Sequence, residues 1–167
     1  EEVANCPGVL RRLENAKRCT RAYVCSDFSY KADRIAGDGW VLVGDAFGFL
    51  DPIYSSGVML ALKSGELAAD AIHDALESGD LSGRSLGRFQ GEFVDGMARM
   101  RKLVYAFYDP NISFARILKE HPHLQDQLTR LLIGDLFTSE VDEILERLIE
   151  VMDWPAEHRA QPSQVTT

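Results

Sequence analysis

The sequence GWVLVGDAFGFLDPIYSSGVMLAL, residues 39–62, decides how the rest of the chain is organised. Residues 40–43 form a continuous apolar run between two glycines, which predicts a strand buried on both faces. Gly44 allows a sharp turn or a close approach to a ligand, because it has no Cβ atom. Asp45 then follows the strand, at the end where open α/β sheets bind their ligands. A carboxylate there accepts hydrogen bonds from the hydroxyls of a sugar or a polyol.

The second half of this stretch predicts a helix with free amides at its start. Pro52 keeps the residue before it extended, so the helix must begin later. Two serines suit the cap of a helix that we expect over residues 58–78, namely Ser55 and Ser56. The amides of Gly57 and Val58 then lie unpaired at the positive end of the helix dipole. They favour a small anion or a carbonyl-rich ring edge.

The two motifs together resemble a known family. Gly-Asp-Ala at 44–46, followed by Asp-Pro-x-x-x-x-Gly at 51–57, resembles the second FAD-contacting motif of flavin-dependent monooxygenases related to p-hydroxybenzoate hydroxylase. The version Asp-Pro-Ile-Tyr-Ser-Ser-Gly is most similar to flavin-dependent halogenases. The resemblance runs from about Phe28 to Ala75, in a strand-turn-helix context. On spacing alone, a β-turn-α unit that only packs into a core is an equally good interpretation.

The resemblance implies FAD as the cofactor and gives several residues a role. The FAD-contacting residues are then expected to be Gly44, Asp45, Pro52, Gly57 and Val58. Asp45 would bind the ribitol chain, and Pro52 would lie against the isoalloxazine ring. The amides of Gly57 and Val58 would meet the pyrimidine end of that ring and stabilise negative charge. In a halogenase, Ser56 and Gly57 would also hold the halide.

Two departures from the family pattern refine this interpretation. Tryptophan halogenases carry a glutamate where this chain has Tyr54, so a phenolic, pyrrolic or carrier-tethered substrate, or plain hydroxylation, fits better. The chain also has no Gly-x-Gly-x-x-Gly after a strand to hold the ADP half of FAD. The family places its halogenating lysine in that N-terminal region. We therefore assign no catalytic residue here and interpret the chain as the C-terminal part of a longer enzyme.

The fold expected is α+β and mainly helical, with a few strands followed by a C-terminal helical bundle. It would complete the FAD-binding α/β domain of the longer chain. We expect residues 1–78 to belong to that FAD-binding domain, residues 79–155 to form the helical region, and residues 156–167 to be a flexible tail.

Local patterns predict the individual elements. A strand is expected over residues 21–30, with core positions at Tyr23, Phe28 and Tyr30, and a hairpin-like connection over 30–40. Helices are expected over residues 7–17, 85–108, 112–119 and 124–133, and from Ser139 onward with Asp142 in a capping box. The apolar stripe of the 85–108 helix is interpreted as core between helices rather than as a substrate pocket: Leu86, Phe89, Phe93, Met97, Met100, Val104 and Phe107.

Composition excludes several classes of protein. The 167 residues carry a net charge of −8 without a basic cluster, which argues against nucleic acid as a partner. The three cysteines lack metal-binding spacing and indicate reduced thiols in the cytoplasm. No segment is long and apolar enough to cross a membrane. His73 has no evident partner in the sequence, and the His121-Pro122-His123 pair has no nearby ligand set, so we assign no metal.

These observations predict an FAD-dependent oxidoreductase of the monooxygenase or halogenase type. The resemblance implies that it acts through a flavin hydroperoxide on an aromatic or carrier-tethered small molecule, with a flavin reductase supplying reduced FAD. Two alternatives stay open. One is a flavin reductase of the geranylgeranyl-reductase type, and the other is a non-catalytic helical interaction module that kept the motif as architecture.

Overall fold

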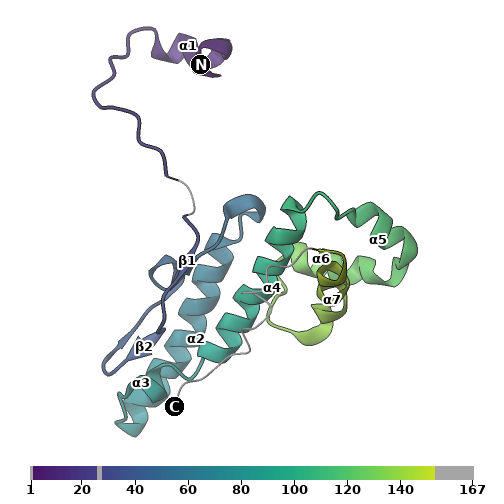
Figure 1. Ribbon diagram of the computed structural model, residues 1–167. Coiled ribbons are helices and arrows are strands. Elements are labelled where there is room, and N and C mark those ends of the chain that lie inside the picture. Colours follow the sequence, from purple (N-terminus) through teal and green to yellow (C-terminus); the bar gives the residue numbers. More distant parts are fainter. Residues whose placement is uncertain (1, 26–27, 153–167) are drawn as a thin grey trace.

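The computed structural model describes residues 2–25 and 28–152, and helices dominate it (Figure 1). The two longest helices, α2 (Gly57–Ser78) and α4 (Gln90–Tyr108), pack against each other. Short strands lie on one side of α2, and the C-terminal helices pack near the end of α4. The predicted fold class, mainly helical with a few strands, is therefore confirmed.

The strands form two antiparallel pairs. β1 (Tyr30–Lys31) pairs with β4 (Gly48–Phe49), and β2 (Ala36–Gly37) pairs with β3 (Trp40–Val41). The β2–β3 pair is the predicted hairpin, and Gly39 turns it with a φ of +78°. Because β1 and β4 flank this hairpin, the Gly44 turn is brought close to the chain around Tyr30.

Two strand predictions are wrong. Residues 21–25 and 28–29 have no regular structure, and Tyr23, Phe28 and Tyr30 are exposed rather than in the core. The predicted strand over residues 40–43 ends at Val41. Its side chains are not buried on both faces as predicted, because Trp40 is 44% exposed and Val43 is 38% exposed. The physical reason is the lack of partners, because β3 pairs on one edge only within the described residues, and an apolar run forms a buried strand only between neighbours.

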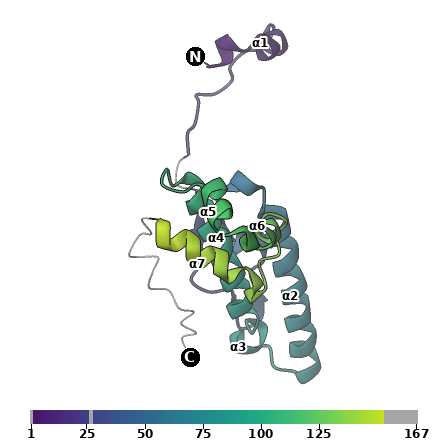
Figure 2. The same ribbon diagram turned by 90° about the vertical axis from the view of Figure 1, so that its right-hand side faces the viewer.

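The N-terminal helix is shorter than predicted and stands apart from the rest in both views (Figures 1 and 2). A 3-10 turn (η1, Glu2–Asn5) precedes α1, which spans Pro7–Leu13 rather than residues 7–17. Its apolar face is not buried, because Leu10 and Leu13 are 46% and 45% exposed. The amphipathic pattern correctly predicts a helix, but the apolar face of α1 is not buried against any other described element.

The predicted 85–108 helix is interrupted near its start. A short helix, α3 (Gly83–Leu86), ends at Gly87, and α4 begins only at Gln90. Arg88, in the break, forms an ion pair with Asp74 of α2. The stripe along α3 and α4 is core as predicted, except that Phe107 is 49% exposed.

Shorter helices follow α4 in the order expected. They are α5 (Phe114–Glu120), η4 (Pro122–Leu124), α6 (Gln125–Leu132), η5 (Ser139–Val141) and α7 (Asp142–Val151). The predicted Ser139 cap is wrong, since the Thr138 hydroxyl accepts the hydrogen bond from the Glu140 amide. The Asp142 carboxylate instead accepts two hydrogen bonds from Arg99 of α4, one from Nε at 2.7 Å and one from Nη2 at 3.1 Å. The predicted tail over residues 156–167 lies outside the described residues.

One hydrophobic core joins these elements. It runs from Ile35 and Phe47 under the strands, along α4, to the inner faces of α6 and α7. Its largest fully buried side chains are Phe47, Phe93, Ile35, Met97, Met100, Leu103, Leu124, Leu131, Leu136, Ile144, Leu145 and Leu148. This core fixes the end of α2 against the Gly44 turn, where the predicted site residues lie.

Candidate functional site

The Gly44 turn is anchored on α2 by a buried hydroxyl. Gly44 opens a 3-10 turn (η2, Gly44–Ala46) with a φ of +53°. Its amide donates to Oγ of Ser64 at 2.8 Å, and that hydroxyl donates in turn to the carbonyl of Ala61 at 2.9 Å. A Cβ atom on Gly44 would lie 3.1 Å from the Cβ of Ala61. The predicted reasons for a glycine, a left-handed turn and a close approach, are therefore both present.

Asp45 lies at the exposed side of this turn. Its backbone carbonyl accepts a hydrogen bond from the hydroxyl of Tyr30 on β1. In residues 2–25 and 28–152, the structure records no hydrogen bond or ion pair of the Asp45 carboxylate. The side chain is therefore free to accept hydrogen bonds from a ligand, as the sequence predicts.

The Asp51–Pro52 corner is held to the end of α4. Asp51 is extended, and its Oδ1 atom accepts hydrogen bonds from the Ile53 amide and from the Tyr108 hydroxyl, each at 3.1 Å. Burial and the nearby Asp51 carboxylate raise the pKa of Tyr108. Pro52 begins a 3-10 turn (η3, Pro52–Tyr54) and is exposed. The corner thus fixes the direction in which the chain enters α2.

The start of α2 differs from the predicted serine cap. Ser56 occupies the cap position, but its side chain makes no capping hydrogen bond, and Ser55 adopts a left-handed conformation with a φ of +54°. The first helical bond is donated by the Leu60 amide to the Ser56 carbonyl at 3.0 Å. Among the described residues, no acceptor is recorded for the amides of Gly57 and Val58. The predicted pair of unpaired amides is therefore present, without a serine hydroxyl to occupy them.

A shallow hollow brings two of these segments together. It is partly open to solvent and encloses about 10 Å³, room for about one water molecule, so by itself it is far smaller than the roughly 300–1,000 Å³ usual for small-molecule sites. It is lined by Gly44, Asp45, Gly48, Phe49, Leu50, Ser56, Gly57, Leu60 and Phe93. Four of the six predicted site residues thus converge on one hollow, whereas Pro52 and Val58 do not line it.

The sequence interpretation missed two contributors to this hollow. Ser64 lies about two helical turns inside α2 and is fully buried, and only the fold shows that it supports Gly44. Phe93 belongs to the apolar stripe of α4 and is 1% exposed, yet it also forms part of the hollow's floor. The phenylalanine stripe was the available signal, although core packing correctly describes most of it.

The residues lining the hollow fit the polar parts of a flavin. Gly57 has an ordinary φ, and a Cβ atom built on it would meet nothing within 4 Å, so neither backbone conformation nor packing in the described chain explains a glycine there. A ligand seated against the backbone of Gly57 would explain it. The unpaired amides and the free Asp45 carboxylate supply the donors and the acceptor that such a ligand needs.

Tyr54, at the position where the family pattern has a glutamate in tryptophan halogenases, does not line the hollow. Its ring packs edge-on against Phe107 of α4, with ring centroids 5.7 Å apart. Burial raises its pKa, so the phenol stays protonated at neutral pH. Tyr54 therefore has a packing contact of its own and does not line the candidate site.

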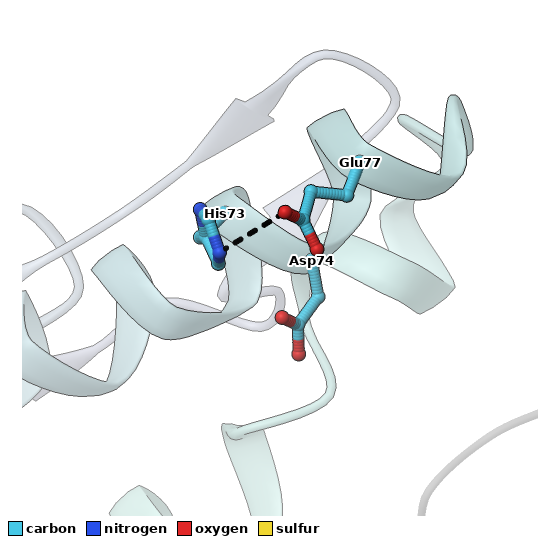
Figure 3. Close-up of side chains that lie close together, drawn as sticks. All are labelled: His73, Asp74 and Glu77. Atoms are coloured by element: carbon cyan, nitrogen blue, oxygen red, sulfur yellow. Dashed lines mark ion pairs between the residues drawn. The ribbon is translucent and has the colours of Figure 1, made fainter.

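A second group of titratable side chains lies on α2, away from the hollow. Figure 3 shows His73, Asp74 and Glu77, whose ligand-type atoms lie within 4.8 Å of one another. His73 has a partner after all, since its Nε2 atom lies 3.5 Å from Oε1 of Glu77. All three side chains are exposed, and Asp74 is paired with Arg88. We assign these residues to surface ion pairing.

The remaining histidine, cysteine and membrane predictions can also be compared with the structure. His123 Nε2 forms a hydrogen bond of 3.0 Å with Glu143, which joins η4 to α7. Cys6, Cys19 and Cys25 are exposed and not in disulfides. Within the described part of the chain, no helix combines the length and apolar character needed to cross a bilayer.

Comparisons with curated proteins place the chain beside carrier-protein halogenases. It is 32% identical over 127 residues to a 1H-pyrrole-2-carbonyl-[peptidyl-carrier protein] chlorinase of Pseudomonas fluorescens, a match that covers 76% of this chain and 28% of the relative. It is 37% identical over 134 residues to the corresponding brominase of Pseudoalteromonas luteoviolacea, covering 80% of this chain and 32% of the relative. No protein-family model matches the chain.

A solved structure shares the fold. The flavin-dependent brominase Bmp2 superposes with a TM-score of 0.64 at 34% identity, over 86% of this chain and 36% of the brominase chain. The chain is therefore homologous to flavin-dependent halogenases, and the resemblance inferred from residues 44–57 is confirmed. It spans about a third of the length of the curated relatives that it matches.

Proposed function

We propose that this chain is part of a flavin-dependent halogenase and that it forms one wall of the FAD site. The observation that carries the proposal is the convergence of Gly44, Asp45, Ser56 and Gly57 on one hollow, in a chain whose homologues are flavin-dependent halogenases. FAD would be held by these residues, and bound flavin supplies the oxidising chemistry that the side chains here lack.

Each predicted FAD-contacting side chain or amide has a specific task in this proposal. The Asp45 carboxylate accepts hydrogen bonds from ribitol hydroxyls, and the buried Ser64 hydroxyl keeps the turn beneath it in place. The unpaired amides of Gly57 and Val58 donate to the polar edge of the ring. Pro52 does not line the hollow, so its contact with the ring would come from the exposed outer side of the corner.

The halide would lie beside Ser56 and Gly57. Ser56 is 6% exposed and Gly57 begins α2, so an anion there would meet backbone amides in a partly dry setting. The positive end of a 22-residue helix favours negative charge at this point. Helix geometry thus offers a halide site that needs no cationic side chain.

The substrate class follows from the relatives. The matched chlorinase and brominase are named for a pyrrole-2-carbonyl group carried on a peptidyl-carrier protein. We propose a carrier-tethered aromatic ring of this kind as the substrate, a flavin reductase as the source of reduced FAD, and the cytoplasm as the compartment, in keeping with three exposed cysteines that form no disulfide. In the whole enzyme, residues 1–78 would belong to the FAD domain and residues 79–155 to the helical region.

The test uses the longer polypeptide in which this chain occurs. The purified protein should retain yellow flavin and, given reduced FAD, oxygen and a pyrrolyl carrier protein, should replace ring hydrogen by halogen only when chloride or bromide is present. Mass spectrometry of the carrier protein measures the product. Halide-independent oxygenation would replace the proposal by hydroxylation, and reduction of a prenyl double bond would replace it by the reductase alternative.

The role of Asp45 is tested with a charge-matched control. Asp45→Ala should weaken flavin retention, measured by absorbance after gel filtration, because the ribitol chain loses its acceptor. Asp70→Ala removes the same charge from the exposed side of α2 and should leave retention unchanged. Equal retention in both variants would contradict the ribitol role, and an absence of bound flavin in the parent protein would favour the non-catalytic module.

A further inference from the structure

The outer side of α2 carries an apolar stripe whose largest exposed side chains have little cover in the described chain. Its members recur at helical spacing along one face, and we call them the outer stripe: Val58, Leu62, Gly65, Ala69, Ile72 and Leu76. Three large side chains of this stripe are highly exposed: Val58 at 74%, Leu62 at 71% and Leu76 at 64%. Figure 2 shows α2 along one edge of the molecule, with the other helices to one side of it.

The opposite side of α2 is already used for packing. Its inner face is buried against η2, α3 and α4 and consists of Leu60, Ser64, Ala68, Ala71 and Ala75. Titratable residues lie in the remaining sector, among them Glu66, Asp70, His73 and Glu77. A helix at the surface of a protein has one apolar face, whereas a helix with two is typical of a position between layers.

Gly65 gives an independent indication of a neighbour. It lies in the middle of the outer stripe with an ordinary helical conformation, and a Cβ atom built on it would meet nothing within 4 Å. Glycine in a helix interior costs stability relative to alanine, because it loses more backbone freedom on folding. No contact in the described chain offsets this cost. A close approach by another backbone, between the large side chains of Leu62 and Leu76, would explain the glycine.

The comparisons indicate what covers the stripe. This chain superposes on the brominase over 86% of its own length, but that match accounts for only 36% of the brominase chain. A homologous enzyme thus contains nearly twice as much polypeptide outside the matched region as within it. We propose that the outer stripe of α2 is the docking face for that remaining polypeptide, which packs against it in cis through an apolar surface. The inference rests on the part of the proposed function that makes this chain a piece of a longer enzyme.

The energetics favour an intramolecular occupant. Burying a side chain such as Leu62 or Leu76 is favourable, and a tethered partner does not lose the translational freedom that a separate molecule loses. Covering the stripe also places protein beside Gly57 at the first turn of α2. The docking face and the candidate flavin site therefore share one end of this helix.

Thiol protection in the longer polypeptide tests the proposal. Cys6, Cys19 and Cys25 are first replaced by serine to remove the exposed thiols. Single reporters are then placed at Leu62→Cys, at Leu76→Cys as a second reporter far from the candidate flavin site, and at Glu66→Cys as the control on the polar side. The rate of reaction with a maleimide dye is measured for each folded variant and divided by its rate in denaturant.

The stripe reporters should react roughly a hundredfold more slowly than the Glu66→Cys control, because dye reaches them only after local opening. Equal rates at all three positions would overturn the proposal. Protection that disappears on dilution, together with a dimer in gel filtration, would also overturn it and assign the stripe to a second copy. Protection in a protein without flavin or halogenase activity would support this inference and refute the proposed function, so the two failures are distinguishable.

Discussion

The amide of Gly44 and the hydroxyl of Ser64 are hydrogen bonded at 2.8 Å, although twenty residues separate them in the chain. Ser64 is fully buried and donates its own proton to the Ala61 carbonyl, so the hydroxyl is satisfied on both sides. This bond ties the turn that carries Asp45 to the helix whose first turn carries Gly57. The distance between the two halves of the candidate site therefore depends on one serine.

Replacing that serine should destabilise the chain. Ser64→Ala leaves the Gly44 amide without its acceptor in a partly buried place, which costs about 1–3 kcal/mol. Urea unfolding followed by circular dichroism measures the change. Ser78→Ala is the control, because this residue is exposed and its hydroxyl bonds only backbone groups at the end of the same helix. Equal effects of the two substitutions would contradict the special role of Ser64.

The left-handed turn at Gly44 should tolerate no side chain. Gly44→Ala introduces both an unfavourable φ, at a cost of about 1–2 kcal/mol, and a contact with Ala61. Gly39→Ala introduces the same kind of strain at φ +78° but meets nothing within 4 Å. The difference between the two unfolding free energies isolates the contact with α2. A larger loss at Gly39 than at Gly44 would show that the turn is not closely packed.

Gly57→Ala should separate ligand binding from stability. Because Gly57 has an ordinary φ and open space at its Cβ position, the substitution should change the unfolding free energy by less than about 0.5 kcal/mol. In the longer enzyme it should weaken flavin retention by roughly tenfold, since the added methyl would meet the ring edge. Gly91→Ala, in a similarly open place on α4, is the control. Flavin retention equal to that of the control would argue against a ligand at Gly57.

Acid should weaken the contact between η4 and α7. Hydrogen bonds from His123 and then Gln127 lower the pKa of Glu143 from its ordinary value of 4.5. A carboxyl whose pKa is lowered by folding stabilises the fold above its unfolded pKa, and this stabilisation is lost as the pH falls through the folded value. The melting temperature of Glu143→Gln should therefore lie below that of the wild type above pH 4.5, with the gap closing at lower pH.

Glu146→Gln is the matched control for this prediction, because it changes an exposed glutamate on the same helix. Its melting temperature should follow that of the wild type more closely across the same pH range. A gap for Glu143→Gln that stays constant with pH would show that the charge of Glu143 does not contribute.

Local sequence predicted the elements that depend on local chemistry. The β2–β3 hairpin follows from its Gly-Asp-Gly turn, and α2 follows from the proline corner and the apolar run after it. Burial was predicted less well. Residues 21–25 and 40–43 carry strand-forming side chains, but a strand is stabilised by its neighbours, and these runs find few within the described chain.

The sequence by itself determined the chemistry at the candidate site, because Gly44, Asp45, Ser56 and Gly57 lie in two short motifs whose residue types limit what they can bind. Only the tertiary structure decided that these motifs share one hollow, that Phe93 lines it and that Arg99 pairs with Asp142. Those relationships join residues from eleven to more than forty positions apart. They depend on how α2 and α4 pack, and no local pattern encodes the packing of distant side chains.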